Sequence, residues 1–148
     1  MTEAELRIFI DIVQHYFEQQ TGRPAEMGTP FLGDQGTLPV LDFTGLIGIS
    51  GNRHGCVYFT ATAALLRQLL VHGGETDVSL RNLADLAGEI ANTISGNARR
   101  MFGHEFIISV PDVITDPHQQ IALPANVKAY VIPLSWQQEE AALVVSVV

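Results

Sequence analysis

A long amphipathic helix is predicted by the stretch Leu83-Ala-Asp-Leu-Ala-Gly-Glu-Ile-Ala-Asn-Thr-Ile-Ser-Gly-Asn-Ala-Arg-Arg-Met101. Winding this stretch at about 100° per residue brings its large apolar side chains onto one stripe. A stripe of this width is typical of a helix that packs against a sheet. The stripe consists of Leu83, Leu86, Ile90, Ile94, Ala98 and Met101.

The opposite face of this helix carries polar residues at spacings of four, three and four. They are Asp85, Glu89, Asn92 and Gly96, and we call them the polar strip. Such a face can simply be solvated, but Asn is a poor interior helix former and Gly costs about 1 kcal/mol there relative to Ala. Gly88 and Gly96 would also leave gaps beside the Glu89–Asn92 turn, where a partner's backbone could approach. These features favour a binding or catalytic face.

Length and composition limit the class of protein. A chain of 148 residues with 47% hydrophobic content has the size of one domain, which we expect to span residues 1–148. The net charge is −8, and the longest basic cluster is Arg99-Arg100. A nucleic-acid partner is therefore not expected.

The sequence also indicates the cellular compartment of the protein. No apolar run approaches the roughly 18 residues of a membrane span, and the N-terminus lacks the pattern of a signal peptide. One cysteine, Cys56, allows neither an internal disulfide nor a cysteine-rich zinc site. We therefore expect a cytoplasmic protein with no membrane segment.

Periodicity predicts the order of the other elements. A helix, a hairpin and a second helix precede the long helix, and four or five strands follow it. This order contains no βαβ repeat, so we predict an α/β sandwich of the α+β kind, a mainly antiparallel sheet covered by helices. The predicted helices are 3–20 and 63–71, and the predicted strands are 38–50, 55–60, 104–110, 111–114, 120–123, 127–134 and 141–148.

Local signals bound these elements. The long helix has two candidate N-caps, Asp77 and Ser79, and Gly103 is expected just after its end. Gly45 and Gly48 suggest a bulge in the first hairpin strand. Pro111 cannot donate to a ladder, so it predicts a bulge, a crossover or a strand end.

Other chemistries have weaker signals. None of the five histidines pairs with another at metal-ligand spacing. Cys56 lies in a predicted strand, where a buried structural thiol is the expected role. Arg53 and Arg81 could each bind an anion, although isolated surface arginines often have no ligand.

The pattern Asp85-Xaa3-Glu89-Xaa2-Asn92, followed by Gly96-Asn97-Ala98 and a strand at Pro111–Ile114, resembles the CheC/CheX/FliY family of chemotaxis phosphatases. The likeness is greatest to CheX, because a second Glu-Xaa2-Asn motif is lacking. Length and element order agree with this family, which implies a CheC-like fold. Two departures are a shorter interval from Asn92 to Pro111 and an acid, Asp112, where a small hydroxyl residue is common.

The resemblance implies a phosphatase that acts on the aspartyl phosphate of a CheY-like response regulator. Glu89 and Asn92 would be the catalytic pair, with Asp85, Gly88 and Gly96 contacting the partner. Mg²⁺ would be supplied by the regulator, and the chain would have no cofactor of its own. The alternative is a non-catalytic adaptor that binds a response regulator or a flagellar switch component.

The resemblance also implies a homodimer paired through the sheets. The C-terminal run Ala141–Val148 is long and apolar on both faces, so at a sheet edge it would need a cover. The other possibility is that this strand lies mid-sheet within one subunit. In the first arrangement the run would contact a second copy of the chain, and in the second it would contact strands of its own subunit on both sides.

Overall fold

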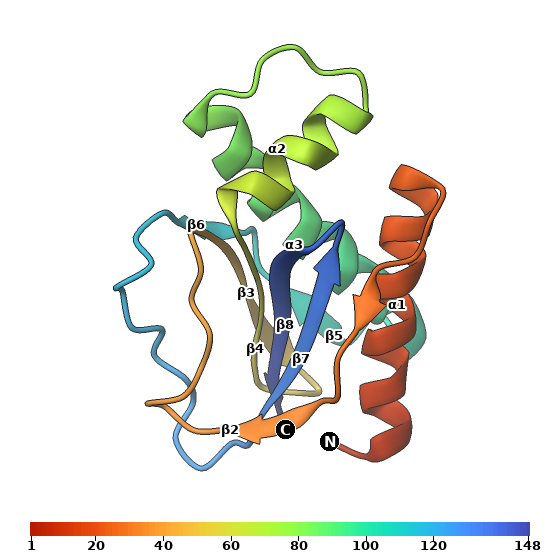
Figure 1. Cartoon of the computed structure of the whole chain (residues 1–148). Coiled ribbons are helices and arrows are strands. Elements are labelled where there is room, and N and C mark those ends of the chain that lie inside the picture. The colour runs from red at the N-terminus through yellow and green to blue at the C-terminus, as the bar shows by residue number, and fades with distance from the viewer.

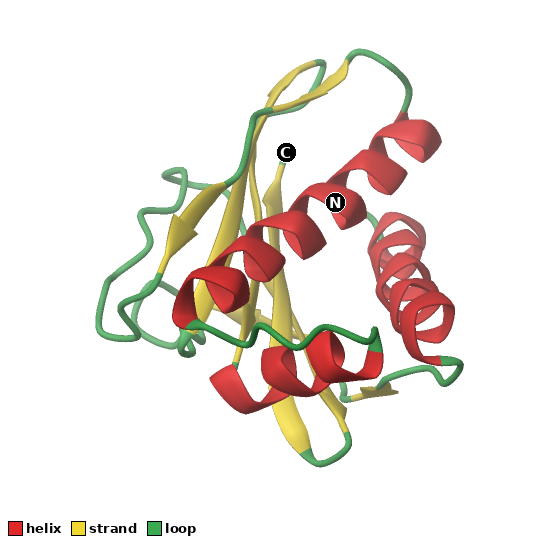
Figure 2. Ribbon diagram, turned by 90° about the horizontal axis from the view of Figure 1, so that it is seen from above, coloured by secondary structure: helices red, strands yellow, loops and turns green.

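The computed structural model describes all 148 residues and consists of one antiparallel sheet with three helices on one of its faces. Figure 1 shows α1 (Glu3–Thr21) beside the sheet and α3 (Leu80–Phe102) behind it, and Figure 2 shows all three helices on the same side of the strands. The predicted α+β sandwich is confirmed. None of the helices is both long enough and apolar enough to cross a bilayer.

The three helices begin at side-chain caps. In α1, Glu3–Thr21, Thr2 and Glu5 form a capping box. Thr62 caps α2, Ala63–His72. Ser79 caps α3, Leu80–Phe102, which settles the choice between Asp77 and Ser79, and Asp77 instead accepts a hydrogen bond from the Ser79 N–H.

The sheet has the strand order β1-β7-β8-β4-β3-β5, with β2 also paired to β7 and β6 also paired to β3. Every pairing is antiparallel. The strands are β1 Glu26–Met27, β2 Phe31–Gly33, β3 Phe43–Gly51, β4 Gly55–Ala61, β5 Phe106–Ile108, β6 Asp112–Ile114, β7 Ala129–Trp136 and β8 Glu139–Val147.

The expected bulge in the first hairpin strand is absent, because β3 and β4 pair in unbroken register from Phe43 opposite Ala61 to Ile49 opposite Gly55. Gly45 has another role. A Cβ at this position would lie 2.4 Å from the carbonyl oxygen of Ala87 and 2.9 Å from the Ala91 Cβ. Gly45 therefore allows α3 to cross β3 at close range.

The bulge lies on the other side of β3. Strands β5 and β6 both pair with β3, but Ile49 opposes Ile108 whereas Thr44 opposes Ile114, so the register shifts by one residue between them. Pro111 stands in this interruption, as a residue without an N–H is expected to do. The sequence left a bulge, a crossover or a strand end open at Pro111, and the structure shows an interruption between two strands with a one-residue shift in register.

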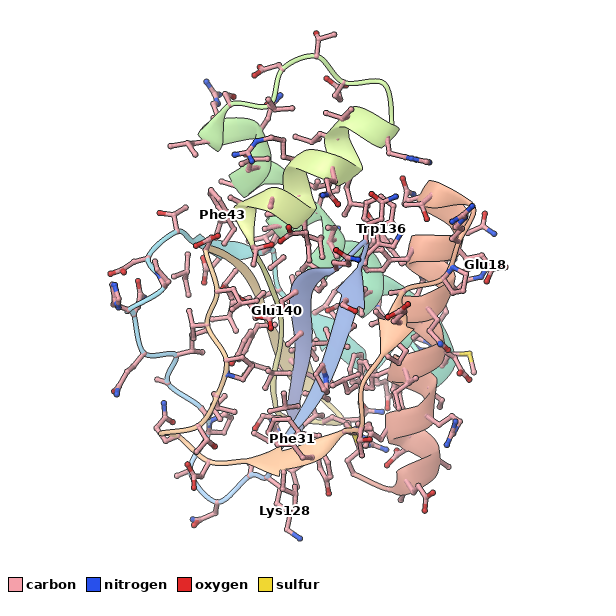
Figure 3. All side chains as sticks on the ribbon, viewed as in Figure 1. Glu18, Phe31, Phe43, Lys128, Trp136 and Glu140 are labelled. Atoms are coloured by element: carbon pink, nitrogen blue, oxygen red, sulfur yellow. The ribbon has the colours of Figure 1, made fainter.

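The main core lies between the sheet and the helices. It contains 27 buried residues, including Phe9 and Phe17 of α1 and Leu65 of α2. Trp136 lies at the end of its strand, near α2 (Figure 3). Its ring centroid is 6.3 Å from that of Phe17 and 6.0 Å from that of His72, so it closes one end of this core. The helices are thus fixed to the sheet by packing.

The other face of the sheet is covered by irregular chain. Ile121 is buried there beside Tyr58 and Val144, and Leu38 and Val40 pack against the same cluster. The predicted strand at 120–123 is therefore wrong, and β3 begins at Phe43 rather than at 38. The apolar residues in 38–42 and in 120–123 are explained by packing against this face of the sheet and not by pairing as strands.

The C-terminal strand β8 lies in the middle of the sheet, between β4 and β7. It pairs with β4 from Ala141 to Val147 and with β7 from Glu139 to Val145. Residues Ala141 to Val147 are all buried. Its apolar composition is explained by this position within one subunit, so the run itself needs no second copy as a cover.

Candidate functional site

The helix α3 is a rigid support for the predicted site, because its inner face is locked into the core. Leu83, Ile90, Ile94 and Ala98 are fully buried as predicted. Met101 is 64% exposed, so its assignment to the buried stripe is wrong. Met101 lies about five turns after Leu83 and on the same side of α3, but it belongs to the last turn of the helix, where it lines a groove beside α1 and faces solvent.

The polar strip faces outward. Asp85, Glu89 and Asn92 are exposed, and Gly96 is partly exposed. The three side chains make no hydrogen bond and no ion pair within the chain, whose one ion pair joins Glu5 and Arg53. Glu89 and Asn92 are separated by less than one turn, so a carboxylate and an amide lie side by side with free hydrogen-bonding groups.

Gly88 does not provide the gap that the sequence suggested. It is buried, and a Cβ at this position would lie 2.9 Å from Val113 Cγ2 and 3.6 Å from Pro111 Cβ. The missing side chain makes room for β6 of the same chain and not for a partner. Gly96 differs, because nothing lies within 4 Å of its Cβ position.

Tyr16 lies near the polar strip and was not identified from the sequence as part of it. It belongs to α1, and it is half-buried. Burial raises the pKa of Tyr16 to about 12, with a smaller contribution from the negative charge of Glu89. Periodicity places Tyr16 on the apolar side of α1, but no sequence signal shows which residue of α3 it meets.

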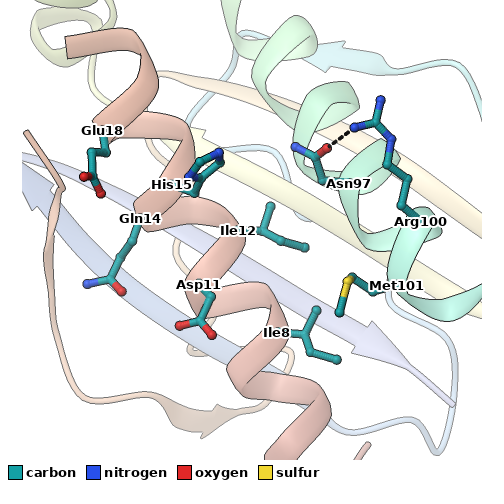
Figure 4. A pocket seen from close by; sticks show the side chains of 9 residues that line it. All are labelled: Ile8, Asp11, Ile12, Gln14, His15, Glu18, Asn97, Arg100 and Met101. Carbon is teal, nitrogen blue, oxygen red and sulfur yellow. Dashed lines mark hydrogen bonds between the residues drawn. The ribbon is translucent and has the colours of Figure 1, made fainter. Parts of the chain in front are cut away.

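A groove of about 570 Å³ runs between α1 and α3. Its lining includes Ile12, His15 and Met101, together with Asn97 and Arg100, but neither Glu89 nor Asn92 (Figure 4). Asn97 had no clear role in the sequence, and here its Oδ1 accepts a hydrogen bond from Arg100 Nη1 at 3.3 Å. The groove therefore lies beside the polar strip and does not contain Glu89 or Asn92.

A second hollow, of about 520 Å³, lies at the end of α3 beside β5. It includes Gly96, so it joins the polar strip directly. Three of its six lining residues carry basic side chains. The lining residues are Gly96, Arg99, Arg100, Gly103, His104 and Ile108.

Of the remaining candidate residues, Cys56 and Arg53 serve the fold, whereas Arg81 is exposed. Cys56 is buried, and desolvation raises the pKa of its thiol to about 11. Arg53 pairs with Glu5 and lies over the Phe102 ring, so it is not free to bind an anion. No group of three or more His, Cys, Asp or Glu side chains could hold a metal ion.

Comparison with known families gives one match. Residues 43–135, more than half of the chain, match the family model described as chemotaxis phosphatase CheX. This segment contains α3 and the complete polar strip. No curated protein matches the sequence.

Several solved structures share the fold. A CheC-like superfamily protein from Shewanella sp. PV-4 is 23% identical, with a TM-score of 0.87 and coverage of 100% of this chain and 99% of that one. The chemotaxis protein CheX from Vibrio vulnificus is 20% identical, with a TM-score of 0.83 over 98% and 99% of the chains. A CheX–CheY–BeF3–Mg²⁺ complex from Borrelia burgdorferi matches at 17% identity, with a TM-score of 0.79 over 97% of each chain.

Proposed function

The chain belongs to the family of the chemotaxis phosphatase CheX, and from this membership we propose that it hydrolyses the aspartyl phosphate of a CheY-like response regulator. The choice of partner is supported by the Borrelia burgdorferi relative, which was solved in complex with CheY, BeF3 and Mg²⁺. The function of the family and the polar strip of this chain thus suggest the same chemistry.

The observation that carries the proposal is that Glu89 and Asn92 lie next to each other on the exposed face of α3. Both side chains are exposed and unpaired, whereas Leu83, Ile90 and Ile94 on the opposite face of the same helix are fully buried. A helix fixed in this way can present two functional groups with little loss of conformational freedom on docking. Placement on a rigid element favours a catalytic role over a merely solvated face.

In the proposed mechanism, Asn92 orients the attacking water. Hydrolysis of an acyl phosphate requires a water in line with the phosphorus and the leaving carboxylate oxygen. The Asn92 amide both donates and accepts hydrogen bonds, so it can fix the position of this water. The water oxygen forms the new bond to phosphorus, and the bond to the aspartyl oxygen breaks with its electron pair left on the aspartate carboxylate. The water protons leave with the inorganic phosphate.

Glu89 would dock the regulator. Its carboxylate can accept hydrogen bonds from a lysine or an amide beside the phosphorylated aspartate, which would align α3 with the cleft. Asp85 lies one turn earlier and extends this acidic contact, and Gly96 leaves the helix surface open on the far side of Asn92.

The metal ion of the reaction would be Mg²⁺ held by the regulator. Mg²⁺ in phosphoryl-transfer sites is bound by one or two carboxylates together with phosphate oxygens and water. Because the carboxylates that bind this metal would belong to the regulator, Asp85 and Glu89 of this chain would contact the partner protein and not the metal. The metal also neutralises phosphoryl charge, which lowers the repulsion between the regulator and an acidic chain.

The direct test is loss of phosphate from a phosphorylated CheY-like regulator with and without the chain. We expect the decay to accelerate in proportion to the concentration of the chain. Unchanged decay across several regulators, despite measurable binding, would contradict the phosphatase and favour the non-catalytic adaptor. Absence of both binding and acceleration would contradict both functions.

We further propose that residues 1–148 act as one domain and that the chain forms a homodimer. The run 141–148 no longer supports dimerisation, because β8 is buried within the subunit. The support now comes from the outer edge formed by β5 and β6, which pair only with β3 on their inner side. Exposed apolar side chains lie at this edge.

A further inference from the structure

The basic hollow at the end of α3 continues the polar strip beyond the proposed catalytic residue. Gly96 lies one turn after Asn92 and lines the hollow, and Arg99 lies two turns after Asn92. At a rise of about 1.5 Å per residue, Arg99 is roughly 10 Å from Asn92 along the helix axis. A protein that contacts Asn92 is therefore within reach of the hollow.

Both arginines are held in place without being neutralised. Arg99 Nη2 donates to the carbonyl oxygen of His104 at 3.0 Å, and Arg100 reaches back along α3 to the Asn97 Oδ1 (Figure 4). Neither contacts a carboxylate, since the one ion pair of the chain is Glu5–Arg53. Each guanidinium has five N–H donors, so most of them remain available to a ligand.

The helix dipole accounts for only part of this charge. The C-terminal end of a helix carries roughly half a negative charge, which a nearby cation offsets. Two guanidinium groups exceed that requirement. They also stand out on a chain with 16 acidic and 8 basic residues, where an acidic partner would meet repulsion from most other directions.

We propose that the hollow lined by Arg99, Arg100 and His104 receives a carboxylate of the response regulator, next to its phosphorylated aspartate. This inference rests on the proposed function. Carboxylates are expected at that place because they bind the Mg²⁺ of the regulator, and the arginine fork matches carboxylate geometry. Arg99 and Arg100 are thus specificity-determining residues that select and orient the partner.

The proposal gives the polar strip a direction. Glu89 on one side of Asn92 would meet a cationic or amide group, and the hollow on the other side would meet an anion. If α3 lay in the regulator's cleft in the opposite direction, Glu89 would face the anion and the arginines would face the cationic group. The repulsion between these like charges disfavours that orientation. The charge pattern would therefore align the water held by Asn92 with the phosphoryl group.

The test compares two double variants with the same change in net charge. Arg99→Gln/Arg100→Gln alters the hollow, and Arg7→Gln/Arg67→Gln removes two exposed charges from α1 and α2. Association with a CheY-like regulator loaded with BeF3⁻ and Mg²⁺ is measured by stopped flow at several salt concentrations. We expect the first variant to associate about tenfold more slowly at low salt and with a weaker salt dependence, and to show a higher KM when the phosphorylated regulator is the substrate. The second variant should follow the parent.

Equal association of both double variants and the parent would overturn the inference. In that case, acceleration of dephosphorylation by the parent would still support the proposed function. Conversely, arginine-dependent binding without acceleration would support the hollow as a docking site and contradict the phosphatase. A chain that bound no regulator would overturn the inference directly.

Inorganic phosphate serves as the second probe, because it is also an oxyanion and is the product of the reaction. Phosphate is titrated into the isolated chain, and the Gly96 and Gly103 amide signals are followed by NMR. Phosphate binding that is lost in Arg99→Gln/Arg100→Gln, while association with the regulator is unchanged, would make the hollow a product site and overturn the docking role. Slower association of the same variant would support docking.

Discussion

Among single side chains, Asn92 provides the sharpest test of the chemistry, because its proposed task is confined to the reacting water. We expect Asn92→Ala to lower the rate of dephosphorylation by about 100-fold, as the loss of a positioning group commonly does. The free energy of unfolding should change little, since Asn92 is exposed and unpaired. Phosphate release under saturating regulator is the measurement.

The matched control for Asn92 is Thr93→Ala, at the next exposed position of α3. Thr93 lies outside the polar strip, and its variant should keep the parent rate. Activity of Asn92→Ala equal to that of Thr93→Ala would remove Asn92 from the mechanism.

Glu89 should affect binding as well as turnover. Glu89→Ala removes a charged contact, so we expect weaker association with the regulator and a lower kcat/KM. Glu89→Gln keeps the hydrogen-bond acceptor and should fall between the parent and the alanine variant. Titration calorimetry with the BeF3⁻-loaded regulator and steady-state kinetics measure the two effects. Identical values for all three proteins would show that Glu89 is only solvated.

The sequence predicted that Glu89 and Asn92 of α3 face outward, but not what surrounds them. Exposure of Glu89 and Asn92 follows from the helical period, which is a local property. Burial of Gly88 against Val113 and the position of Tyr16 depend on β6 and α1. These partners are far away in the sequence, and the spacing within α3 contains no information about them.

At the level of elements, the crossing of α3 over β3 depends on Gly45. The methyl group of Gly45→Ala would meet the backbone of Ala87, which cannot move without displacing the helix. We expect a loss of roughly 1–3 kcal/mol in the free energy of unfolding, as for other overpacked cores. Urea denaturation followed by circular dichroism is the measurement.

Gly96→Ala is the matched control for Gly45→Ala. Its Cβ position is open, and Ala is favoured over Gly within a helix by about 1 kcal/mol. We therefore expect Gly96→Ala to stabilise the chain. A Gly45→Ala variant as stable as the parent would show that the crossing tolerates a wider separation.

The contact between α1 and the β3–β4 turn predicts a pH dependence. Hydrogen bonding to Arg53 and to the Thr2 backbone lowers the pKa of Glu5 from 4.5 to about 2. Because the folded-state pKa lies below the ordinary value, the ion pair contributes stability above about pH 4.5 that is lost as the pH falls toward 2. Thermal melting between pH 6 and pH 2 should show this loss.

Glu5→Gln should flatten the acid limb of that profile. Glu3→Gln is its control, since Glu3 lies in the same first turn of α1 and is exposed. A parent profile that matched the Glu5→Gln profile throughout would contradict the role of the pair.

Element boundaries were predictable where local signals define them. The capping residues Thr2, Thr62 and Ser79 and the turn before β4 lie next to the elements that they bound. The helices α1, α2 and α3 and the turn of the hairpin are therefore close to their predicted limits, whereas β3 begins later than predicted. The strand expected at 120–123 is irregular chain, because Ile121 is apolar in order to cover the sheet. An apolar run shows burial but does not show which neighbour provides it.

Across the whole molecule, the position of β8 changes how assembly should be tested. A charge introduced between Val144 and Val147 would lie inside the subunit and unfold it. The unpaired edge formed by β5 and β6 carries Val110, 82% exposed, with Ile107 and Val113 close to it in the chain. An exposed apolar edge strand favours pairing with a second copy.

We therefore expect the chain to sediment as a homodimer at micromolar concentration and Val110→Glu to shift it to monomer with the fold intact. The control is Val71→Glu on α2, where an equally charged side chain replaces a 59% exposed valine away from the edge. Circular dichroism establishes that both variants are folded. A monomeric parent would contradict the dimer, and a dimer that withstands Val110→Glu would place the contact elsewhere. Dissociation by Val110→Glu but not by Val71→Glu would assign the dimer contact to the β5–β6 edge, which lies on the opposite side of β3 from β4.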